Sequence, residues 1–439
     1  MAIATFLSFS STPFSKKCHT FAHDPRQYIQ PDDLLFIIRH AVLAAQDKVM
    51  PAYLVVKPRC RIFHGHDWVY GSDIISTRGN PQPGDVVLLK DSKARLVGSA
   101  IYNSRSQIAA RRFSFRKQDL DMEFFERRIE RALAHRATLP IDQKVCRVVW
   151  SESDGVPGVI IDRYGDHIVL QTLTTAMDMR KELIAEAIRK VLNPKSIIER
   201  NDSLMRKAEG LEQVKSVLYG TAPAPFMVKS GKTILRADLM EGQKTGLYLD
   251  QLDNYTQVGR YAKDKRVLDC FTNQGGFAQA CAENGAKSVL AVDSSEPALT
   301  LAKMNADYAQ LKINFIKENV FDFLKDMEKR EEVFDLIILD PPSFTKTKSS
   351  INDALRGYKE IHLRALKMLN PGGVLVSFSC SHHITGGDLR QVIMSAGVDS
   401  RRALRRLATY TQRSDHPIIC GIPETEYLRG YAVEVMGAW

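Results

Sequence analysis

The chain has 439 residues, of which 44% are hydrophobic and 26% are charged; this composition is typical of globular proteins, and the length predicts two or three domains. No stretch approaches about 18 consecutive apolar residues, so a membrane-spanning segment is not expected. The net charge of +10 favours polyanionic partners, but it does not choose between RNA, DNA and anionic lipid.

Residues 1–49 differ in composition from the rest of the chain. Residues 1–23 are rich in Ser and Thr and contain no Asp or Glu, but Lys16 and Lys17 are their only Lys or Arg residues, so the likeness to a transit peptide is partial. A strand-like segment then begins at Met50-Pro51. We expect residues 1–49 to be a poorly ordered extension and the protein to be cytoplasmic, or organellar if the extension is a transit peptide.

Residues 50–120 contain short strand-like segments separated by turns. Examples are Tyr53–Val56, Asp85–Lys90 and Leu96–Tyr102, with prolines and glycines between them. Regularly spaced short strands predict a small β-barrel.

Residues 121–235 are expected to form a linker helix and a small α+β domain. Phe125, Ile129 and Leu133 recur every four residues and predict a helix over 120–137. A strand is expected over Ile168–Leu173 and a second helix over Asp178–Val191.

Residues 236–439 show strands and helices in alternation. This pattern predicts a parallel, doubly wound sheet. The expected strands are Val267–Phe271, Ser288–Val292, Asn314–Lys317, Phe334–Leu339 and Val374–Ser379. The expected helices lie near Phe277–Asn284, Glu296–Tyr308, Val320–Lys329 and Tyr358–Leu369.

Two of these strands end in acidic residues that favour a nucleoside-type cofactor. Asp269 closes the first strand, and Gly275-Gly276 opens the following helix, where glycine lets a ligand approach the backbone. Asp293 ends the second strand, where a carboxylate can bind the hydroxyls of a ribose. The glycines do not form the G-x-G-x-x-G fingerprint, which disfavours a nicotinamide cofactor. Taken singly, each element is also common in ordinary turns.

The fourth strand is followed by Asp340-Pro-Pro-Ser-Phe344. Two prolines make a stiff, extended segment, which would suit a wall that holds a planar base. The alternative is a plain turn at the end of a strand.

Cys380 ends the fifth strand, at the same predicted edge as Asp269 and Asp340. A thiol there, next to serines and to His382-His383, would be a nucleophile if its neighbours lower its pKa. The alternative is an inert core cysteine. The seven cysteines are irregularly spaced without a C-x-x-C pair, so neither a disulfide framework nor a zinc site is expected, and the default compartment is a reducing one.

These motifs together resemble the bacterial large-subunit ribosomal RNA cytosine-5 methyltransferases of the RlmI type, from about Met50 to the C-terminus. The matching segments are Lys57-Pro58, Gly65-His-Asp-Trp-Val-Tyr70, Glu152-Ser-Asp-Gly-Val-Pro-Gly158, Asp162-Arg-Tyr-Gly165, Gln243-Lys-Thr-Gly-Leu-Tyr-Leu-Asp-Gln251, Asp340-Pro-Pro-Ser-Phe344, Ser379-Cys-Ser381, Asp415-His-Pro417 and Glu426-Tyr-Leu428. The resemblance implies a multidomain α/β protein. Its parts are a PUA-like small β-barrel, a central α+β domain and a Rossmann-like class I methyltransferase domain that binds S-adenosylmethionine.

The resemblance also implies the residues of the site. Cys380 would add to C6 of cytosine, and Asp340 would hold the N3 edge. The residues expected to bind the cofactor are Tyr248, Asp250, Gln251, Asp269, Phe271, Gly275, Gly276, Phe277, Asp293, Ser294 and Asn319. Pro341, Pro342 and Phe344 would bind the substrate base. The expected partner is ribosomal RNA, without a membrane or a metal, and a homodimer is left open.

The sequence departs from the family pattern at three positions. Leu252 and Tyr255 stand where the family has arginines, which would weaken binding to RNA phosphates. Asn319 replaces an aspartate, so we expect a changed contact to adenine rather than a lost cofactor.

Other functions remain open on the sequence alone. A methyltransferase acting on an exocyclic amine or on guanine needs no thiol and can use the Asp-Pro-Pro motif. A non-catalytic PUA-type RNA-binding protein in ribosome assembly is a second alternative, and a dehydrogenase is the third.

Overall fold

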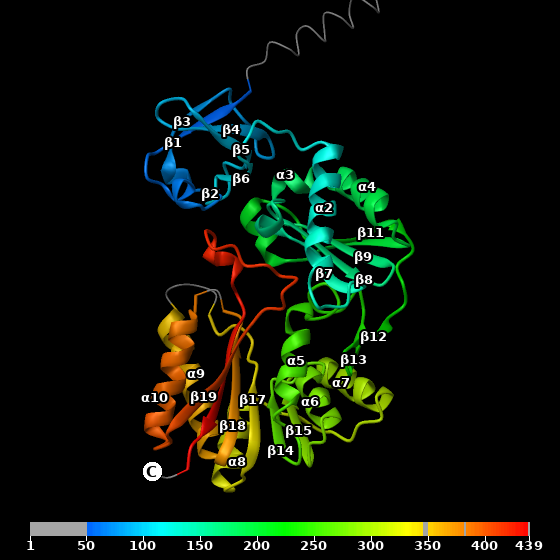
Figure 1. Ribbon diagram of the computed structural model, residues 1–439, viewed down its shortest axis with the longest axis vertical. Helices are drawn as coiled ribbons and strands as arrows, with labels where there is room; N and C mark the ends of the chain where they lie inside the picture. Colours follow the sequence, from blue (N-terminus) through cyan, green and yellow to red (C-terminus); the bar gives the residue numbers. More distant parts are fainter. Residues whose placement is uncertain (1–50, 346–349, 382, 438–439) are drawn as a thin grey trace, which may run out of the picture. The chain divides into compact units, whose positions relative to one another are not determined.

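The computed structural model describes residues 51–345, 350–381 and 383–437 (Figure 1). The predictions for residues 1–49 and for His382 lie outside the described residues. None of the helices in the described part of the chain is long and apolar enough to cross a membrane.

The N-terminal part is a six-stranded sheet in the order β2-β6-β5-β4-β1-β3. Its strands are β1 (Tyr53–Val56), β2 (Trp68–Val69), β3 (Ile74–Arg78), β4 (Val86–Lys90), β5 (Leu96–Tyr102) and β6 (Ala110–Ser114). All pairs are antiparallel except β1 with β4. Leu54, Val56 and Leu89 are fully buried, so the alternating apolar residues of β1 and β4 form the core of this sheet.

The central part begins with α2 (Met122–Ala137), whose N-terminus is capped by the Asp121 carboxylate. A five-stranded sheet follows in the order β11-β10-β9-β8-β7. Its strands are β7 (Val145–Trp150), β8 (Val159–Tyr164), β9 (His167–Thr172), β10 (Ser196–Asn201) and β11 (Val214–Gly220), with α3 (Thr175–Asp178) and α4 (Lys181–Leu192) between β9 and β10. The helix expected over Asp178–Val191 corresponds to α4, which begins at Lys181, after the short α3 has ended at Asp178.

A hairpin of β12 (Phe226–Ser230) and β13 (Thr233–Ala237) leads into the C-terminal part. It packs against α6 and α7 of that part. The predicted boundary at residue 235 therefore falls inside β13.

The C-terminal part is a seven-stranded sheet in the order β16-β15-β14-β17-β18-β20-β19. Its strands are β14 (Arg266–Cys270), β15 (Ser288–Asp293), β16 (Asn314–Lys317), β17 (Phe334–Leu339), β18 (Leu369–Ser379), β19 (Leu404–Thr411) and β20 (Arg429–Val435). The first five strands are parallel, and β20 pairs antiparallel with both β18 and β19. From β14 the next strands, β15 and β16, are added on one side, and from β17 the next strand, β18, is added on the other. The strand order therefore reverses between β14 and β17, which is the point where doubly wound sheets bind their ligands.

Helices cover both faces of this sheet (Figure 1). They are α5 (Leu252–Gly259), α6 (Gly276–Glu283), α7 (Glu296–Tyr308), α8 (Val320–Lys329), α9 (Ile351–Lys367) and α10 (Gly386–Asp399), and a short 3-10 helix, η5 (Leu249–Gln251), precedes α5. Successive strand residues serve the two cores in turn: Val267 packs with α5 and α6, whereas Leu268 packs with α8, α9 and α10.

Two predicted boundaries in this part were wrong. The helix expected near Tyr358–Leu369 begins at Ile351, because Gly357 lies within α9 and does not end it. The strand expected to start at Val374 begins at Leu369, where Leu369 pairs with Phe334 and carries the strand through Pro371 and two glycines.

Candidate functional site

The carboxyl ends of four parallel strands bring the predicted catalytic and cofactor residues to one edge of the sheet. Asp269 is the second-to-last residue of β14, Asp293 ends β15, Asp340 follows β17 and Cys380 follows β18. The strands are in register, because Cys270 pairs with both Val292 and Leu339. The structure therefore places these four side chains at neighbouring strand ends.

The loop between β14 and α6 is shaped by two of these carboxylates. Asp269 Oδ2 accepts hydrogen bonds from Thr272 Oγ1 at 2.6 Å and from the Ala278 amide at 3.0 Å. Asp293 accepts from the Asn273 amide at 2.9 Å and from the Ser295 amide at 2.9 Å. Both carboxylates thus hold backbone in place, besides any contact with a ligand.

Three residues of this loop have positive φ: Phe271 at 61°, Asn273 at 50° and Gly275 at 80°. Positive φ is costly for residues other than glycine, and such residues gather at binding sites. Gly276 has a packing role, since a Cβ there would overlap the Tyr255 ring. The ring of Phe277 is buried and packs edge-on against Tyr255, with 4.7 Å between the ring centres.

Two aspartates of the site, Asp269 and Asp340, are buried without enough positive charge nearby to offset the loss of hydration of their carboxylates. Burial raises the pKa of Asp269 to about 7, with further contributions from Asp340 and Asp293. Burial also raises the pKa of Asp340 to about 7, helped by the charge of Asp250. Asp269 Oδ1 is buried and has no hydrogen-bond partner among the described residues. A positively charged ligand would supply the missing partner.

The segment from Gln243 to Gln251 forms another wall of the site. Gln251 Nε2 donates to Asp340 Oδ2 at 3.0 Å. Asp250 Oδ2 accepts from Lys244 Nζ and from the Tyr427 hydroxyl, each at 2.7 Å. Burial alone would raise the pKa of Asp250, but Lys244, His416 and these hydrogen bonds hold it well below its usual range. The predicted residues Asp250 and Gln251 therefore lie beside the predicted catalytic acid.

Residues of the central part anchor this segment. Thr245 Oγ1 donates to Asp162 Oδ2 at 2.6 Å, and the Tyr164 hydroxyl accepts from the Leu247 amide at 3.2 Å. Asp162 itself accepts from Nε and from one terminal nitrogen of the Arg147 guanidinium, each at 2.8 Å. The Asp162-Arg-Tyr-Gly165 motif thus supports the wall of the site.

Cys380 is partly buried, and its described neighbours do not lower the pKa of its thiol. Burial and the charge of Asp340 raise its pKa to about 11, and the charge of Lys244 offsets only part of this increase. The adjacent serines are engaged elsewhere: Tyr358 contacts Ser379 Oγ at 3.0 Å, and Ser381 Oγ lies 2.9 Å from Ser343 Oγ. The described neighbours of Cys380 therefore do not supply the lowered pKa that was the condition for a nucleophilic thiol.

The Asp-Pro-Pro loop offers one exposed surface and one buried one. Pro341 is buried, whereas Pro342 is exposed. The Phe344 ring packs against Tyr358 at 4.7 Å and Phe321 at 5.7 Å. A contact between a base and Pro342 is sterically open, while Phe344 mainly supports the loop; the substrate roles of all three residues stay predictions.

The remaining predicted cofactor residues lie around the same edge. Ser294 is exposed directly after β15. Asn319 caps α8, with its side-chain oxygen accepting from the Phe321 amide at 2.9 Å. The Tyr248 hydroxyl donates to Gln243 Oε1 at 2.6 Å, and Lys244 Nζ lies 4.3 Å from the centre of the Tyr248 ring.

Two of the three departures from the family pattern lie in the core, whereas Asn319 is exposed. Leu252 and Tyr255 are 2% and 8% exposed, so they change packing, in the case of Tyr255 beside Gly276, rather than a surface that meets phosphate. Sequence reasoning missed Lys244, Tyr358 and Tyr427. Lys244 and Tyr427 fall inside segments that carried the resemblance, but only the fold brings them to Asp250.

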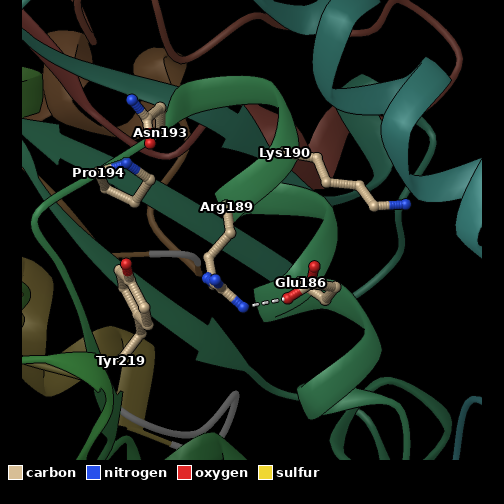
Figure 2. Close-up of a pocket in the computed structure, with 6 residues that line it drawn as sticks. All are labelled: Glu186, Arg189, Lys190, Asn193, Pro194 and Tyr219. Carbon is tan, nitrogen blue, oxygen red and sulfur yellow. Dashed lines mark hydrogen bonds and ion pairs between the residues drawn. The ribbon is translucent and has the colours of Figure 1, made fainter.

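A surface pocket of about 120 Å³ lies away from these strand ends, at the end of α4 and on β11. Figure 2 shows its lining, in which Arg189 pairs with Glu186 and faces Tyr219. Within the described residues, no group of three or more His, Cys, Asp or Glu side chains could hold a metal ion.

Comparison with known proteins places the site in a family context. Residues 222–410 match a family model described as S-adenosylmethionine-dependent methyltransferase, and residues 57–115 match a PUA-like domain. The chain is 38% identical over 379 residues to the ribosomal RNA large subunit methyltransferase I of Tolumonas auensis, covering 84% of this chain and 96% of that protein. It is 36% identical over 399 residues to the protein of the same name from Klebsiella pneumoniae, covering 89% and 100%.

Solved structures share the fold. One, described as "a putative sam-dependent methyltransferase from Streptococcus mutans", has a TM-score of 0.75 and 21% identity, and covers 87% of this chain and all of its own. Another methyltransferase, complexed with SAH, has a TM-score of 0.76 with the same identity and coverage. These likenesses confirm the predicted Rossmann-like architecture of the methyltransferase part.

Proposed function

The chain belongs to the ribosomal RNA large subunit methyltransferase I family, and from that premise we propose that it methylates C5 of a cytosine in 23S ribosomal RNA, with S-adenosylmethionine as methyl donor. The observation that carries the proposal is the placement of Cys380 and Asp340 after neighbouring parallel strands, at the same edge as Asp269 and Asp293. The proposed nucleophile, the proposed acid and the cofactor residues thus lie at the same edge of the sheet.

The residues at this edge fit the proposed cofactor. S-adenosylmethionine carries a sulfonium and an ammonium group, and this edge is rich in carboxylates whose mutual repulsion such charges would relieve. Asp269, with its unpartnered oxygen, would face the cation, and Asp293 would bind the ribose. When bound, the cofactor supplies an electrophilic methyl group.

Cytosine C5 is a weak nucleophile, and covalent addition at C6 would activate it. Cys380 Sγ would bond to C6 as its proton leaves, N3 would gain a proton, and the electron pair of the C5–C6 double bond would make C5 nucleophilic. After C5 has gained the methyl group, the C5 proton would leave to a base. Return of the N3 proton to the Asp340 carboxylate and breaking of the Sγ–C6 bond would then restore the ring. The target base must leave its stack to reach this edge of the sheet.

Asp340 is suited to the N3 edge. A carboxyl with a pKa near 7 can donate a proton to N3 or accept one at neutral pH. Gln251 donates to its Oδ2 and so fixes the orientation of the carboxyl group. Because the pKa of Cys380 is raised to about 11, the thiol must give up its proton in the substrate complex, where a neighbouring acceptor and the base are both present.

Ribosomal RNA transcribed with 5-fluorocytidine tests this mechanism. Fluorine at C5 cannot leave as a proton does, so the wild-type chain should form a covalent RNA complex that survives denaturing electrophoresis. Cys380→Ala should abolish the complex and turnover while keeping affinity for S-adenosylmethionine. Cys420→Ala, which changes an exposed cysteine, is the matched control and should crosslink normally.

Methylation of an exocyclic amine is the competing function, because Asp340-Pro-Pro-Ser343 resembles the motif of that class. An active Cys380→Ala variant, together with a fluorinated RNA that never crosslinks, would overturn the cytosine-5 proposal and favour the amine. In that case the substitution should cost only about 1 kcal/mol of stability.

We propose a PUA-like domain at residues 50–120 and a central α+β domain after it. The methyltransferase domain is best begun before the β12–β13 hairpin, which packs against α6 and α7. A cytoplasmic location, where ribosomal RNA of bacterial relatives is made, and a homodimer stay predictions.

A further inference from the structure

Phe115 directly follows β6. Its exposed fraction of 74% is the largest of any Phe, Tyr or Trp side chain among the described residues. One face of its ring is covered, because the guanidinium carbon of Arg112 lies 4.0 Å from the ring centre. A cation at this distance is attracted to the ring face and holds it in place. An aromatic ring supported from one side and open to solvent has the form of a stacking platform.

The support beneath the ring is rigid. Arg112 is only 5% exposed, and its guanidinium pairs with Asp67 through Nε at 2.8 Å and through a terminal nitrogen at 2.7 Å. Gly98 on β5 makes room for the Arg112 side chain, since a Cβ there would come within 2.9 Å of Arg112 Cδ. The ring therefore rests on a buried arginine that is fixed by a partly buried aspartate, so little side-chain freedom remains to be lost when a ligand binds.

Basic side chains flank the ring. Arg116 and Lys117 are exposed, and neither makes an ion pair with a described residue. Two arginines of α2 contact the same segment: Arg128 donates to the Phe113 carbonyl at 2.7 Å, and Arg127 donates to Gln118 Oε1 at 3.2 Å. Arg127 is partly neutralised by Glu123, at 3.1 Å.

We propose that Phe115 is a stacking platform for an unstacked base of the RNA substrate, with Arg116 and Lys117 binding the phosphates on either side of that base. This inference rests on the proposed function, because that function requires an RNA with a base out of its stack. Proteins that hold single-stranded RNA combine aromatic rings with basic side chains in this way. The free positive charge beside the ring favours RNA over an apolar protein surface.

Binding to a labelled single-stranded RNA of about 12 nucleotides, a length within the range of such sites, tests the platform. Phe115→Ala should raise the Kd about 10-fold, within the range for loss of one stacked base. Phe115→Trp should restore the affinity to within about 2-fold and show fluorescence quenching by the RNA. Phe63→Ala removes another exposed ring of the same domain, at 43% exposure, and should leave the Kd unchanged.

Inorganic polyphosphate, which has charge but no bases, separates stacking from charge. Phe115→Ala should bind it like the wild type, whereas an Arg116→Ala/Lys117→Ala double variant should bind both polyanions more weakly, with a salt dependence reduced by about two counterions. A Phe115→Ala chain with full RNA affinity would overturn the platform and assign the ring to a protein partner. If that chain and the wild type methylate ribosomal RNA equally well, the proposed function stands without the platform; a wild type that binds RNA but never methylates it overturns the function instead.

Discussion

Asp269 and Asp340 hold their protons far above the pH at which exposed aspartates lose them. Burial raises both pKa values to about 7. The charge of Asp340 further raises the pKa of Asp269, and the charge of Asp250 further raises the pKa of Asp340. An aspartate in the unfolded chain has a pKa of about 3.9, so between roughly pH 4 and 7 the folded chain binds more protons than the unfolded chain. The free energy of unfolding therefore falls as the pH rises through this window. The same burial that reduces stability at neutral pH leaves the two carboxylates available to pair with a cationic ligand.

Binding of S-adenosylmethionine should release protons. Its positive charges favour the ionised carboxylates, so binding lowers the pKa of Asp269 and Asp340, and affinity should rise between about pH 6 and 8. Calorimetry at pH 6.5, in buffers that differ in ionisation enthalpy, measures the release, which should vanish above about pH 8. Asp269→Asn should reduce it. Binding without proton release at pH 6.5 would show that these carboxyl groups do not face the cofactor.

The loops after β17 and β18 are held together by α9. The Tyr358 hydroxyl lies 3.0 Å from Ser379 Oγ and 3.4 Å from Ser381 Oγ, and Ser381 Oγ contacts Ser343 Oγ at 2.9 Å. The hydroxyl thus joins the residues on both sides of Cys380 to the Asp-Pro-Pro-Ser loop. Tyr358 is fully buried, so we expect it to be a positioning residue that sets the distance between the thiol and the Asp340 carboxyl.

Tyr358→Phe removes only the hydroxyl and keeps the ring that packs against Phe344. We expect the rate of crosslinking to 5-fluorocytidine RNA and kcat to fall about 10-fold, with unchanged affinity for S-adenosylmethionine, because a small misplacement of reacting groups has large kinetic effects. Tyr308→Phe, at an exposed tyrosine on α7, is the control. Equal loss of cofactor affinity and crosslinking would indicate a general packing defect instead of positioning.

The five parallel strands of the methyltransferase sheet were predicted, whereas the antiparallel strands β19 and β20 were not. The central parallel strands were recognisable as buried apolar runs, as Phe334–Leu339 is before Asp340. The start of α9 was not predicted, because Gly357 in the sequence looks like a helix breaker. In the fold Gly357 faces the Phe344 ring, and a Cβ at this position would lie 3.5 Å from Phe344 Cδ2. Lys244 shows the same limit for the site. A single lysine in a loop has no periodic signal, and its role depends on Asp250 and on the distant Tyr427.

The connection between β19 and β20 contacts both preceding parts of the chain. Asp415 accepts from the Arg147 amide at 2.9 Å, from Arg413 at 2.6 Å and from His416 Nδ1 at 2.8 Å. Glu424 of the same connection pairs with Arg61 of the N-terminal part at 2.9 Å. The connection also supplies Tyr427 to Asp250, so one segment links the parts of the molecule to the wall of the site.

Asp415→Asn should destabilise the whole molecule. Burial alone would raise the pKa of Asp415, but His416 and Arg413 hold it well below its usual range, so the stability it provides is present at neutral pH and is lost as the pH falls below about 4. Removing one charge of a buried pair leaves Arg413 uncompensated, at a cost of about 3 kcal/mol or more. Glu424→Gln, at a partly exposed carboxylate that contacts Arg61 and His66, should cost less stability than Asp415→Asn. Urea unfolding followed by tryptophan fluorescence measures both, since Trp150 lies 5.8 Å from the His416 ring and 5.5 Å from the Tyr427 ring. If the two variants lose the same stability at pH 7, the buried Asp415 carboxylate contributes no more to stability than the Glu424 ion pair does. The backbone contacts of the segment between β19 and β20 would then have to link the parts of the molecule.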